Sequence, residues 1–178
     1  MTISLDRSTA TVPTESVHSG IDSPLFRELL HPQRPLWTPT QLRDLTDIVA
    51  QKLADPLLDI LQFTEPQRWW AQLALTEGVE LWLLSWTPGQ GTKPHDHGGA
   101  AGAFTVLQGS VRESYRYPTG PIRTAHRRLG SGVGFGGGRA HLVQNLGTVN
   151  AATVHAYSPP LIPVREYADL TEVGASRA

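Results

Sequence analysis

The sequence contains no cysteine, which excludes disulfides, thiolate metal ligands and a cysteine nucleophile. Any metal that the chain binds must therefore have nitrogen or oxygen ligands. Charge is also sparse, because charged residues make up 17% of the chain and the formal net charge is −1. The few clustered basic residues, Arg123 and the run of His126, Arg127 and Arg128, are expected to lie solvated at the surface. We expect no nucleic-acid partner.

Long apolar runs are absent as well. No stretch of eighteen apolar residues is present that could span a bilayer, so we expect no association with a membrane. The first twenty residues are rich in Ser and Thr and lack the apolar core of a secretory signal. These features predict a disordered tail over residues 1–20, a cytoplasmic location, and a single domain over residues 21–178.

Helical patterns are confined to residues 21–68. The segment Thr-Pro-Thr-Gln at residues 38–41 is typical of a helix N-terminus with a capping box. A shorter helix is predicted to begin at Ser23-Pro24 and to end near Leu30. The apolar residues after the capping box recur at three- and four-residue spacing, which predicts one apolar stripe made of Leu42, Leu45, Ile48, Val49 and Leu53.

From about residue 70 the sequence breaks into short apolar or alternating runs separated by Gly, Pro and Asn. The predicted strands cover residues 79–86, 103–108, 111–117, 142–145 and 150–157. Short strands at this spacing are typical of an antiparallel sandwich or barrel. We therefore expect a mainly β protein whose α-helical N-terminal part packs on a small β-barrel.

A glycine-rich segment, residues 130–138, contains a formal G-x-G-x-x-G match at Gly132, Gly134 and Gly137. Such a match predicts a dinucleotide site only where a strand precedes it and a helix follows it. Residues 139–147 show no helical periodicity, so we reject a dinucleotide site. Glycines at this density are expected to let strands bend sharply and to bring the backbone close to an interior site.

Histidines are the remaining candidates for metal ligands. Residues i and i+2 of a strand face the same side, so His95 and His97 converge while Asp96 faces away. Two imidazoles directed at one point suit a metal, and the alternative is a hydrogen-bonded pair in a surface loop. Other histidines are expected to be solvated or hydrogen-bonded without a special role: His18, His31 and His126.

Glycines flank these histidines at regular spacing. The pattern G-x5-H-x-H-x4-G-x6-G runs from Gly89 to Gly109, and G-x5-G-x-G-x2-H-x3-N runs from Gly130 to Asn145. Together they resemble the two motifs of the cupin superfamily, whose members hold a metal inside a small jelly-roll-like β-barrel. The resemblance implies one cupin domain with its barrel over about residues 70–160, and a metal held by His95, His97 and His141.

The sequence departs from the cupin pattern at two positions. Gly102 stands where the first motif usually supplies a glutamate ligand, and Gly136 stands where the second motif usually has proline. Without the carboxylate, three neutral imidazoles leave the bound divalent ion with its full charge and with open coordination positions. An open site favours catalysis over a purely structural role.

Four segments narrow the resemblance to the cysteine dioxygenase family: LWLLSWTPGQGTKPHDH at residues 81–97, LQG at 107–109, HLVQN at 141–145 and TVHAYSPP at 153–160. Members of this family use Fe(II) held by three histidines to add both atoms of O2 to a thiol, which gives a sulfinic acid. The resemblance implies Fe(II) as the cofactor and a small thiol and O2 as substrates, with L-cysteine to cysteine sulfinate as the first expectation. It also implies a cis Ser158–Pro159 bond.

A second set of residues supports the same assignment. Thr153, His155 and Tyr157 alternate along a predicted strand, so they share one face and can form a chain of hydrogen bonds. The alternative is a polar strand face exposed to water. The resemblance makes this column catalytic and places Tyr157 next to the iron. Many members carry a cysteine that cross-links to this tyrosine; Gly102 stands there, so Tyr157 is expected to be a free phenol.

The preferred thiol stays open at this stage. Gln72 aligns with the arginine that binds the substrate carboxylate in cysteine-specific members, and mercaptopropionate-type members have glutamine there. Glutamine can hydrogen-bond a carboxylate without neutralising it, so Arg68 or Arg165 is expected to supply the cation. Trp86 is expected to form part of the dry wall of the substrate cavity. The alternative substrate is 3-mercaptopropionate or another small thiol.

Two rival functions remain. Three histidines also suit zinc or manganese, as in a cupin of the isomerase or hydrolase kind. The rival of another class is a non-catalytic metal-binding cupin that senses a small ligand. Oxygen uptake that depends on Fe(II) and a thiol separates the dioxygenase from both rivals. The sequence does not indicate an oligomeric state.

Overall fold

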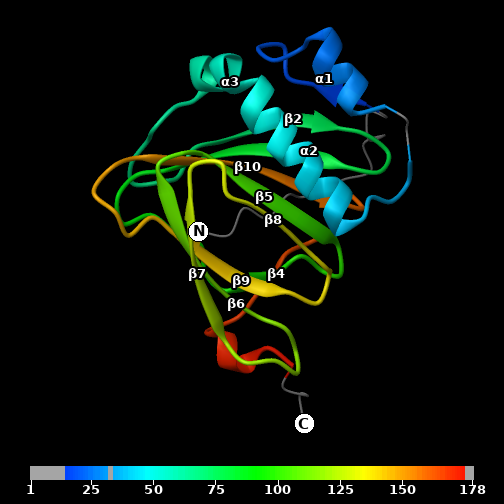
Figure 1. The fold of residues 1–178 in the computed structure, drawn as a ribbon. Helices are drawn as coiled ribbons and strands as arrows, with labels where there is room; N and C mark the ends of the chain where they lie inside the picture. Colours follow the sequence, from blue (N-terminus) through cyan, green and yellow to red (C-terminus); the bar gives the residue numbers. More distant parts are fainter. Residues whose placement is uncertain (1–14, 32–33, 175–178) are drawn as a thin grey trace.

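Two antiparallel sheets make up most of the computed structural model, which describes residues 15–31 and 34–174 (Figure 1). The six-stranded sheet contains, in spatial order, β1 (Ser16–Val17), β2 (Trp70–Leu75), β3 (Glu80–Trp86), β10 (Ala151–Ser158), β5 (Ala101–Gln108) and β8 (Gly132–Phe135). The five-stranded sheet contains β11 (Arg165–Glu166), β4 (His95–Asp96), β9 (Ala140–Gln144), β6 (Ser110–Arg116) and β7 (Arg123–Arg128).

The two sheets pack face to face around an apolar cluster. Both sheets contribute to it, the six-stranded sheet through Trp86, Phe104, Val106, Phe135 and Ala151 and the five-stranded sheet through Val111 and Val143. The mainly β, jelly-roll-like class is therefore confirmed. The hydrogen-bonded ladders of the two sheets remain separate, so the expected barrel is a sandwich and not a closed cylinder.

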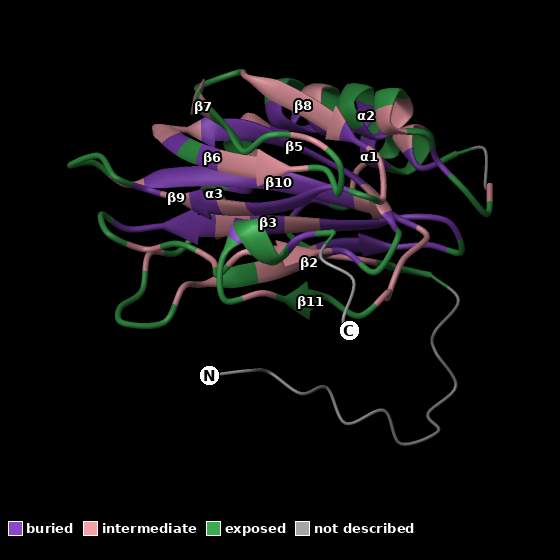
Figure 2. Ribbon diagram, turned by 90° about the horizontal axis from the view of Figure 1, so that it is seen from below, coloured by how far each residue is buried: buried purple, intermediate pink, exposed green. Residues whose placement is uncertain are grey.

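A helical layer covers the opposite face of the six-stranded sheet (Figure 1). It contains α1 (Pro24–Leu29), α2 (Pro39–Lys52) and α3 (Ala54–Ile60). Leu81 and Leu83 of β3 face these helices, whereas Leu84 and Trp86 belong to the cluster between the sheets. Because both faces of this sheet are covered, β3 and β10 are buried over most of their length (Figure 2).

Helix α2 begins at the predicted capping box. The Gln41 N–H donates to Thr38 Oγ1 at 3.3 Å, and the Thr38 N–H donates to Gln41 Oε1 at 3.0 Å. The apolar stripe is as predicted except at Ile48, which is 37% exposed. Thr46 is buried instead, because its hydroxyl accepts a hydrogen bond from Thr105 of β5 at 2.9 Å.

Two glycines of β8 allow this strand to lie close under α2. A Cβ atom at Gly134 would come within 2.2 Å of the Pro39 carbonyl oxygen, and one at Gly132 within 2.0 Å of an Asp47 carboxylate oxygen. At these two glycines the close approach is therefore to a helix at the outer face, whereas Gly137 of the same segment comes close to the backbone of Gly99, two residues after His97. Because Gly132 and Gly134 have no side chains, α2 can pack directly against β8.

Several short elements were not predicted from the sequence. These are β1, β2, β7, β8, β11 and α3, together with the turn of 3-10 helix at Leu170–Glu172. The expected disordered tail falls mostly on residues 1–14, which lie outside the described residues, but Ser16–Val17 pairs with β2. The Ser158–Pro159 bond is cis, as the resemblance implied. No helix within residues 15–31 and 34–174 is long and apolar enough to cross a membrane.

The capping box yields a stability prediction. Thr38→Ala leaves the first-turn N–H of Gln41 without its side-chain acceptor, so we expect a loss of about 1 kcal/mol in the free energy of unfolding. Urea denaturation measures this loss. Thr40→Ala is the matched control, because Thr40 is exposed in the same turn and is not a member of the capping box. Equal losses in the two variants would show that the capping box does not stabilise α2.

Candidate metal centre

Three histidines meet between the two sheets. His95 of β4 lies directly opposite His141 of β9 in the antiparallel ladder, and His97 follows two residues after His95. The ring centroids are 4.9 Å apart for His95 and His141, 5.0 Å for His95 and His97, and 5.1 Å for His97 and His141. One ligand atom from each ring lies within 4.8 Å of the other two. The register of β4 against β9 therefore brings together the three histidines that the sequence singled out.

Hydrogen bonds orient two of the rings. The Nδ1–H of His95 donates to the Lys93 carbonyl oxygen at 2.8 Å, and the Nδ1–H of His141 donates to Glu113 Oε1 at 2.9 Å. Both acceptors lack a proton to give, so each imidazole carries its proton on Nδ1. The lone pair of Nε2 then remains for a metal, which is the usual division of roles in a metal-binding histidine.

The third ring is held by packing. His97 is 5% exposed, and neither of its ring nitrogens has a hydrogen-bond partner among the described residues. Its ring stacks on Tyr157 with centroids 4.6 Å apart. A buried polar group without a partner is costly, and a metal ion bound to one nitrogen of His97 would remove part of that cost. The donor set and this unpartnered side chain both fit a divalent ion with nitrogen ligands.

Burial keeps these imidazoles neutral. Loss of solvation, followed by the repulsion of His141, lowers the pKa of His95 to about 3. Burial also lowers the pKa of His97 far below its usual value, and the neighbouring histidines lower it further. A neutral imidazole is the form that binds metal, so at neutral pH no proton has to leave these two rings first.

Glu113 is the buried carboxylate behind His141. Besides His141, it accepts two N–H groups of Arg127 at 3.1 and 2.9 Å, and Arg139 Nη2 lies 3.0 Å from its Oε1. Burial opposes ionisation of Glu113, but the hydrogen bond from His141 and the charges of Arg139 and Arg127 outweigh it and hold the pKa of this carboxyl below its usual value. An ionised carboxylate behind the ring fixes the orientation of His141.

A hydrogen-bonded column on β10 faces the same interior. Thr153 Oγ1 lies 2.8 Å from His155 Nε2, and His155 Nδ1 lies 2.9 Å from the Tyr157 hydroxyl. Thr153 and His155 are buried and Tyr157 is half-buried, so the alternative of a polar face exposed to water is wrong. Trp86 of β3 adds a fourth member, since its indole N–H donates to Thr153 Oγ1 at 2.8 Å.

The indole determines the direction of this column. Trp86 can only donate, so the single hydroxyl proton of Thr153 must find an acceptor elsewhere. Within the part of the chain that the structure describes, that acceptor is His155 Nε2. Burial lowers the pKa of His155 well below its usual value, so the ring is neutral and its only proton lies on Nδ1, which donates to Tyr157. The phenol accepts from His155 and keeps its own proton free to donate.

Gly102 lies next to Tyr157 in the ladder between β5 and β10. A Cβ atom at Gly102 would lie 3.0 Å from Tyr157 Cδ1, but it would also lie only 2.5 Å from Phe135 Cε2. Phe135 therefore fills the space that a side chain at position 102 would need. Tyr157 has no sulfur neighbour because the chain has no cysteine, and its phenol is free of any cross-link.

The candidate substrate residues separate into two groups. Arg68 lies over the ring of Trp86, 4.2 Å from its centroid, and its buried Nε has no hydrogen-bond partner among the described residues. Burial lowers the pKa of Arg68, and the nearby Tyr157 raises it. Gln72 pairs with Trp82, which in turn pairs with His155, so Gln72 shares the inward face with the column. The structure therefore places Arg68 and Gln72 on the side of the triad.

Arg165 lies elsewhere. It pairs with Asp96, the residue that alternates away from His95 and His97, so its side chain leaves the strand on the opposite face. There it lies over the ring of Tyr167 at 4.9 Å and lines a surface cavity with Asp96. The structure does not bring Arg165 to the histidines.

Two residues of the site were missed in the sequence. Glu113 looked like one of several polar positions in an alternating strand, and only the pairing of β6 with β9 brings it behind His141. Phe135 lay in the glycine-rich segment, where a single aromatic residue gives no periodic signal. Alternation along β6 places Glu113 on the inner face with Val111, and this pattern could have identified Glu113 as an inward-facing carboxylate.

Solved structures share this fold. An uncharacterised conserved protein with a double-stranded β-helix domain from Klebsiella pneumoniae is 17% identical, with a TM-score of 0.52 over 62% of this chain and 92% of that chain. The TT1209 protein of Thermus thermophilus is 21% identical, with a TM-score of 0.51 over 58% of this chain and 93% of that chain. An oxalate oxidase in complex with glycolate is 17% identical, with a TM-score of 0.51 over 58% and 56% of the two chains.

The double-stranded β-helix with a cluster of inward histidines defines a cupin-type protein suited to holding a metal. The sequence matches the family of cysteine dioxygenase type I over residues 58–170, which is more than half of the chain. The chain belongs to this family and is thereby placed with the metal-dependent oxidoreductases. A search of curated proteins found no match.

The direction of the hydrogen-bonded column can be tested by NMR. In the metal-free protein we expect His155 to carry its proton on Nδ1, and in Trp86→Phe we expect the Nε2–H tautomer to gain population, because Thr153 is then free to accept from the ring. Long-range 1H–15N correlation spectra distinguish the two tautomers. Trp82→Phe is the matched control on the same strand. An Nε2–H ring in the unsubstituted protein, or equal spectra for the Trp86 and Trp82 variants, would contradict this direction.

Proposed function

We propose that this protein is an Fe(II)-dependent thiol dioxygenase that oxidises L-cysteine to cysteine sulfinate. The observation that carries the proposal is the convergence of His95, His97 and His141 next to the column that ends at Tyr157. Both oxygen atoms of O2 enter the product and the thiol supplies all the electrons, so the reaction needs no further reductant. This balance fits a site whose only partners are a small thiol and O2.

His95, His97 and His141 would hold the iron through one nitrogen each. The bound ion supplies open positions for the sulfur and for O2 and lowers the pKa of the thiol. A set of three neutral ligands without a carboxylate leaves the charge of the ion available to the thiolate. Zinc satisfies the same ligand set, but it has no redox chemistry with O2, and membership of a dioxygenase family favours iron.

Arg68 is the proposed carboxylate-binding residue. Its guanidinium is held against Trp86, the residue is half-buried with an inaccessible Nε, and it has no acidic partner among the residues that the structure describes. A buried cation without a counter-ion attracts an anionic group of the substrate, and a guanidinium matches the geometry of a carboxylate. Gln72 on the same face can add a neutral hydrogen bond. We include Arg68 and Gln72 in the substrate site, with Trp86 as the wall behind Arg68.

Tyr157 is the proposed hydrogen-bond donor to the substrate or to bound oxygen. Burial raises the pKa of its phenol above the usual value, and the charge of Glu80 raises it further, so the group keeps its proton. His155 and Thr153 are positioning residues, because they touch the phenol or its partner and not the reacting atoms. The ionised form, a phenolate, is disfavoured because burial opposes its charge.

A glutamine on the substrate face also supports a second candidate substrate. 3-Mercaptopropionate has the thiol and carboxylate of L-cysteine but lacks the ammonium group. Within the described part of the chain, no acidic side chain forms an ion pair with Arg68 or a hydrogen bond with Gln72 that could turn toward an ammonium group. We keep 3-mercaptopropionate as the alternative for this reason.

The reaction is tested with the full chain reconstituted anaerobically with Fe(II). An oxygen electrode and product identification then compare L-cysteine, 3-mercaptopropionate and cysteamine. We expect Fe(II)-dependent oxygen uptake and a sulfinate product with the two carboxylate thiols, and much less with cysteamine, which has no carboxylate. Absence of uptake with every thiol would favour a non-catalytic metal-binding sensor, and metal-dependent activity with zinc would favour a hydrolase or isomerase.

Arg68→Gln tests the carboxylate contact. Replacing a charge-assisted contact by a neutral one costs on the order of 1–3 kcal/mol, so we expect KM for L-cysteine to rise at least about tenfold while cysteamine is unaffected. Arg34→Gln is the matched control, because Arg34 lies over Trp37 in a similar cation–π contact outside the site. A KM that stays constant in Arg68→Gln would remove Arg68 from the substrate site.

His97→Ala tests the metal site without using activity. We expect the variant to lose stoichiometric Fe(II) binding, measured by anaerobic titration, because His97 supplies one of three ligands. His126→Ala is the control, since His126 is exposed on β7. Retention of full Fe(II) affinity in His97→Ala would show that the triad does not hold the metal.

A further inference from the structure

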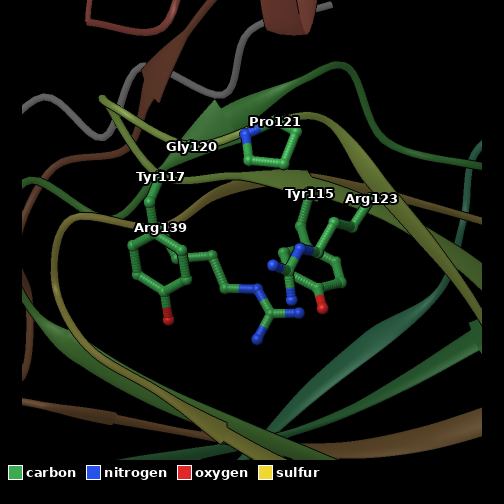
Figure 3. Close-up of a pocket in the computed structure, with 6 residues that line it drawn as sticks. All are labelled: Tyr115, Tyr117, Gly120, Pro121, Arg123 and Arg139. Carbon is green, nitrogen blue, oxygen red and sulfur yellow. The ribbon is translucent and has the colours of Figure 1, made fainter.

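A second cavity lies apart from the histidine cluster, at the end of the five-stranded sheet. It has a volume of about 330 Å³ and is lined by two arginines, two tyrosines and a turn: Arg123, Arg139, Tyr115, Tyr117, Gly120 and Pro121. Figure 3 shows the Arg139 guanidinium between the two tyrosine rings, with Arg123 on the side of Tyr115. None of the proposed metal ligands, nor Arg68 or Tyr157, lines this cavity.

Arg139 is the buried cation of this cavity. It is 4% exposed, and its guanidinium carbon lies 3.5 Å from the centroid of the Tyr115 ring. Its Nη2 lies 3.0 Å from Glu113 Oε1, but neither Nε nor Nη2 forms an aligned hydrogen bond within the described part of the chain. A guanidinium held by a ring and left with unused N–H groups is a donor set for an oxyanion.

The charges around the cavity do not balance. Among the residues that the structure describes, Glu113 is the one carboxylate that forms an ion pair with Arg139, and it also accepts two hydrogen bonds from Arg127 and one from His141. Two arginines therefore share one carboxylate. Arg123, which is exposed, adds a second positive charge to the lining beside Arg139, and no lining residue is acidic. Arg139 is the buried member of this set, and a buried cation that shares its carboxylate with a second arginine would be stabilised by a further anion.

We propose that this cavity binds a small oxyanion, a carboxylate or a phosphate, between Arg139 and Arg123. The tyrosine rings form apolar walls on which the planar body of such a molecule would pack. The volume is at the lower end of the range for small-molecule pockets, which fits a compact ligand. The cavity is lined by none of the residues that would hold the metal or the substrate, and it adjoins the metal site only through the contact of Arg139 with Glu113, the carboxylate behind His141.

The test uses the full chain and two probes, inorganic phosphate and benzoate, at constant ionic strength. Isothermal titration calorimetry measures binding, and 1H–15N NMR locates it. We expect saturable binding of at least one probe, with shifts at residues 115–123 and 139. Binding of phosphate alone would identify a phosphate-type ligand, and binding of benzoate alone a carboxylate with a planar body; each supports the site.

Matched arginine variants decide whether the binding belongs to this cavity. Arg123→Gln is expected to weaken binding about tenfold, because a charge-assisted contact is lost. Arg128→Gln is the control on the same exposed strand, outside the cavity, and is expected to bind normally. The Arg128 variant also controls for the general stabilisation of proteins by phosphate, which does not depend on this cavity.

Arg139→Lys removes the planar fork and the stacking on Tyr115 but keeps the charge, and we expect it to weaken binding as well. If this buried variant does not fold, the comparison of Arg123→Gln with Arg128→Gln still decides. No saturable binding of either probe, or equal binding by the Arg123 and Arg128 variants, would overturn the proposal.

Discussion

The pairing of β4 with β9 is the constraint on which the candidate site depends. It puts His95 directly opposite His141, and the alternation of the chain then returns His97 to the same side. A slip of one residue would turn these side chains to the outer face, where Asp96 now lies. The two-residue strand β4 has little hydrogen bonding of its own, so its register relies on β9 on one side and β11 on the other.

Hydrogen bonds around the three histidines fix which groups of the site donate and which accept. Lys93 and Glu113 accept from the outer nitrogens of two histidines, and Trp86 donates into the column that ends at Tyr157. Each of these contacts fixes, directly or through Thr153, which nitrogen of a neutral imidazole carries the proton. The consequence is an interior in which lone pairs face the triad while the phenol proton of Tyr157 stays free to donate. Preorganised donors and acceptors of this kind are more effective than mobile ones, because they need no rearrangement during reaction.

Local signals in the sequence were sufficient to predict much of the fold and part of the site. The capping box at Thr38 and the alternation of Thr153, His155 and Tyr157 are short-range patterns, and each predicted its element. The triad needed more than spacing, because His141 lies far from His95 in sequence and only the family motif joined them. Glu113, Phe135 and the indole of Trp86 act through cross-strand neighbours, which a single sequence does not reveal. Arg165 is the opposite case: it was a candidate cation for the substrate carboxylate, but its pairing with Asp96 turns it away from the histidines.

The contact between Gly102 and Phe135 has a consequence beyond this chain. The two positions share one volume next to Tyr157, so the space can hold either a side chain on β5 or an aromatic ring on β8, but not both. Homologous sequences should therefore show a reciprocal size pattern at these two sites, with a bulky β8 residue accompanying glycine and a smaller one accompanying any larger residue on β5. The cross-linked and uncross-linked forms of the tyrosine would then be two solutions to one steric problem, reached by paired substitutions and not by the loss of a single sulfur atom.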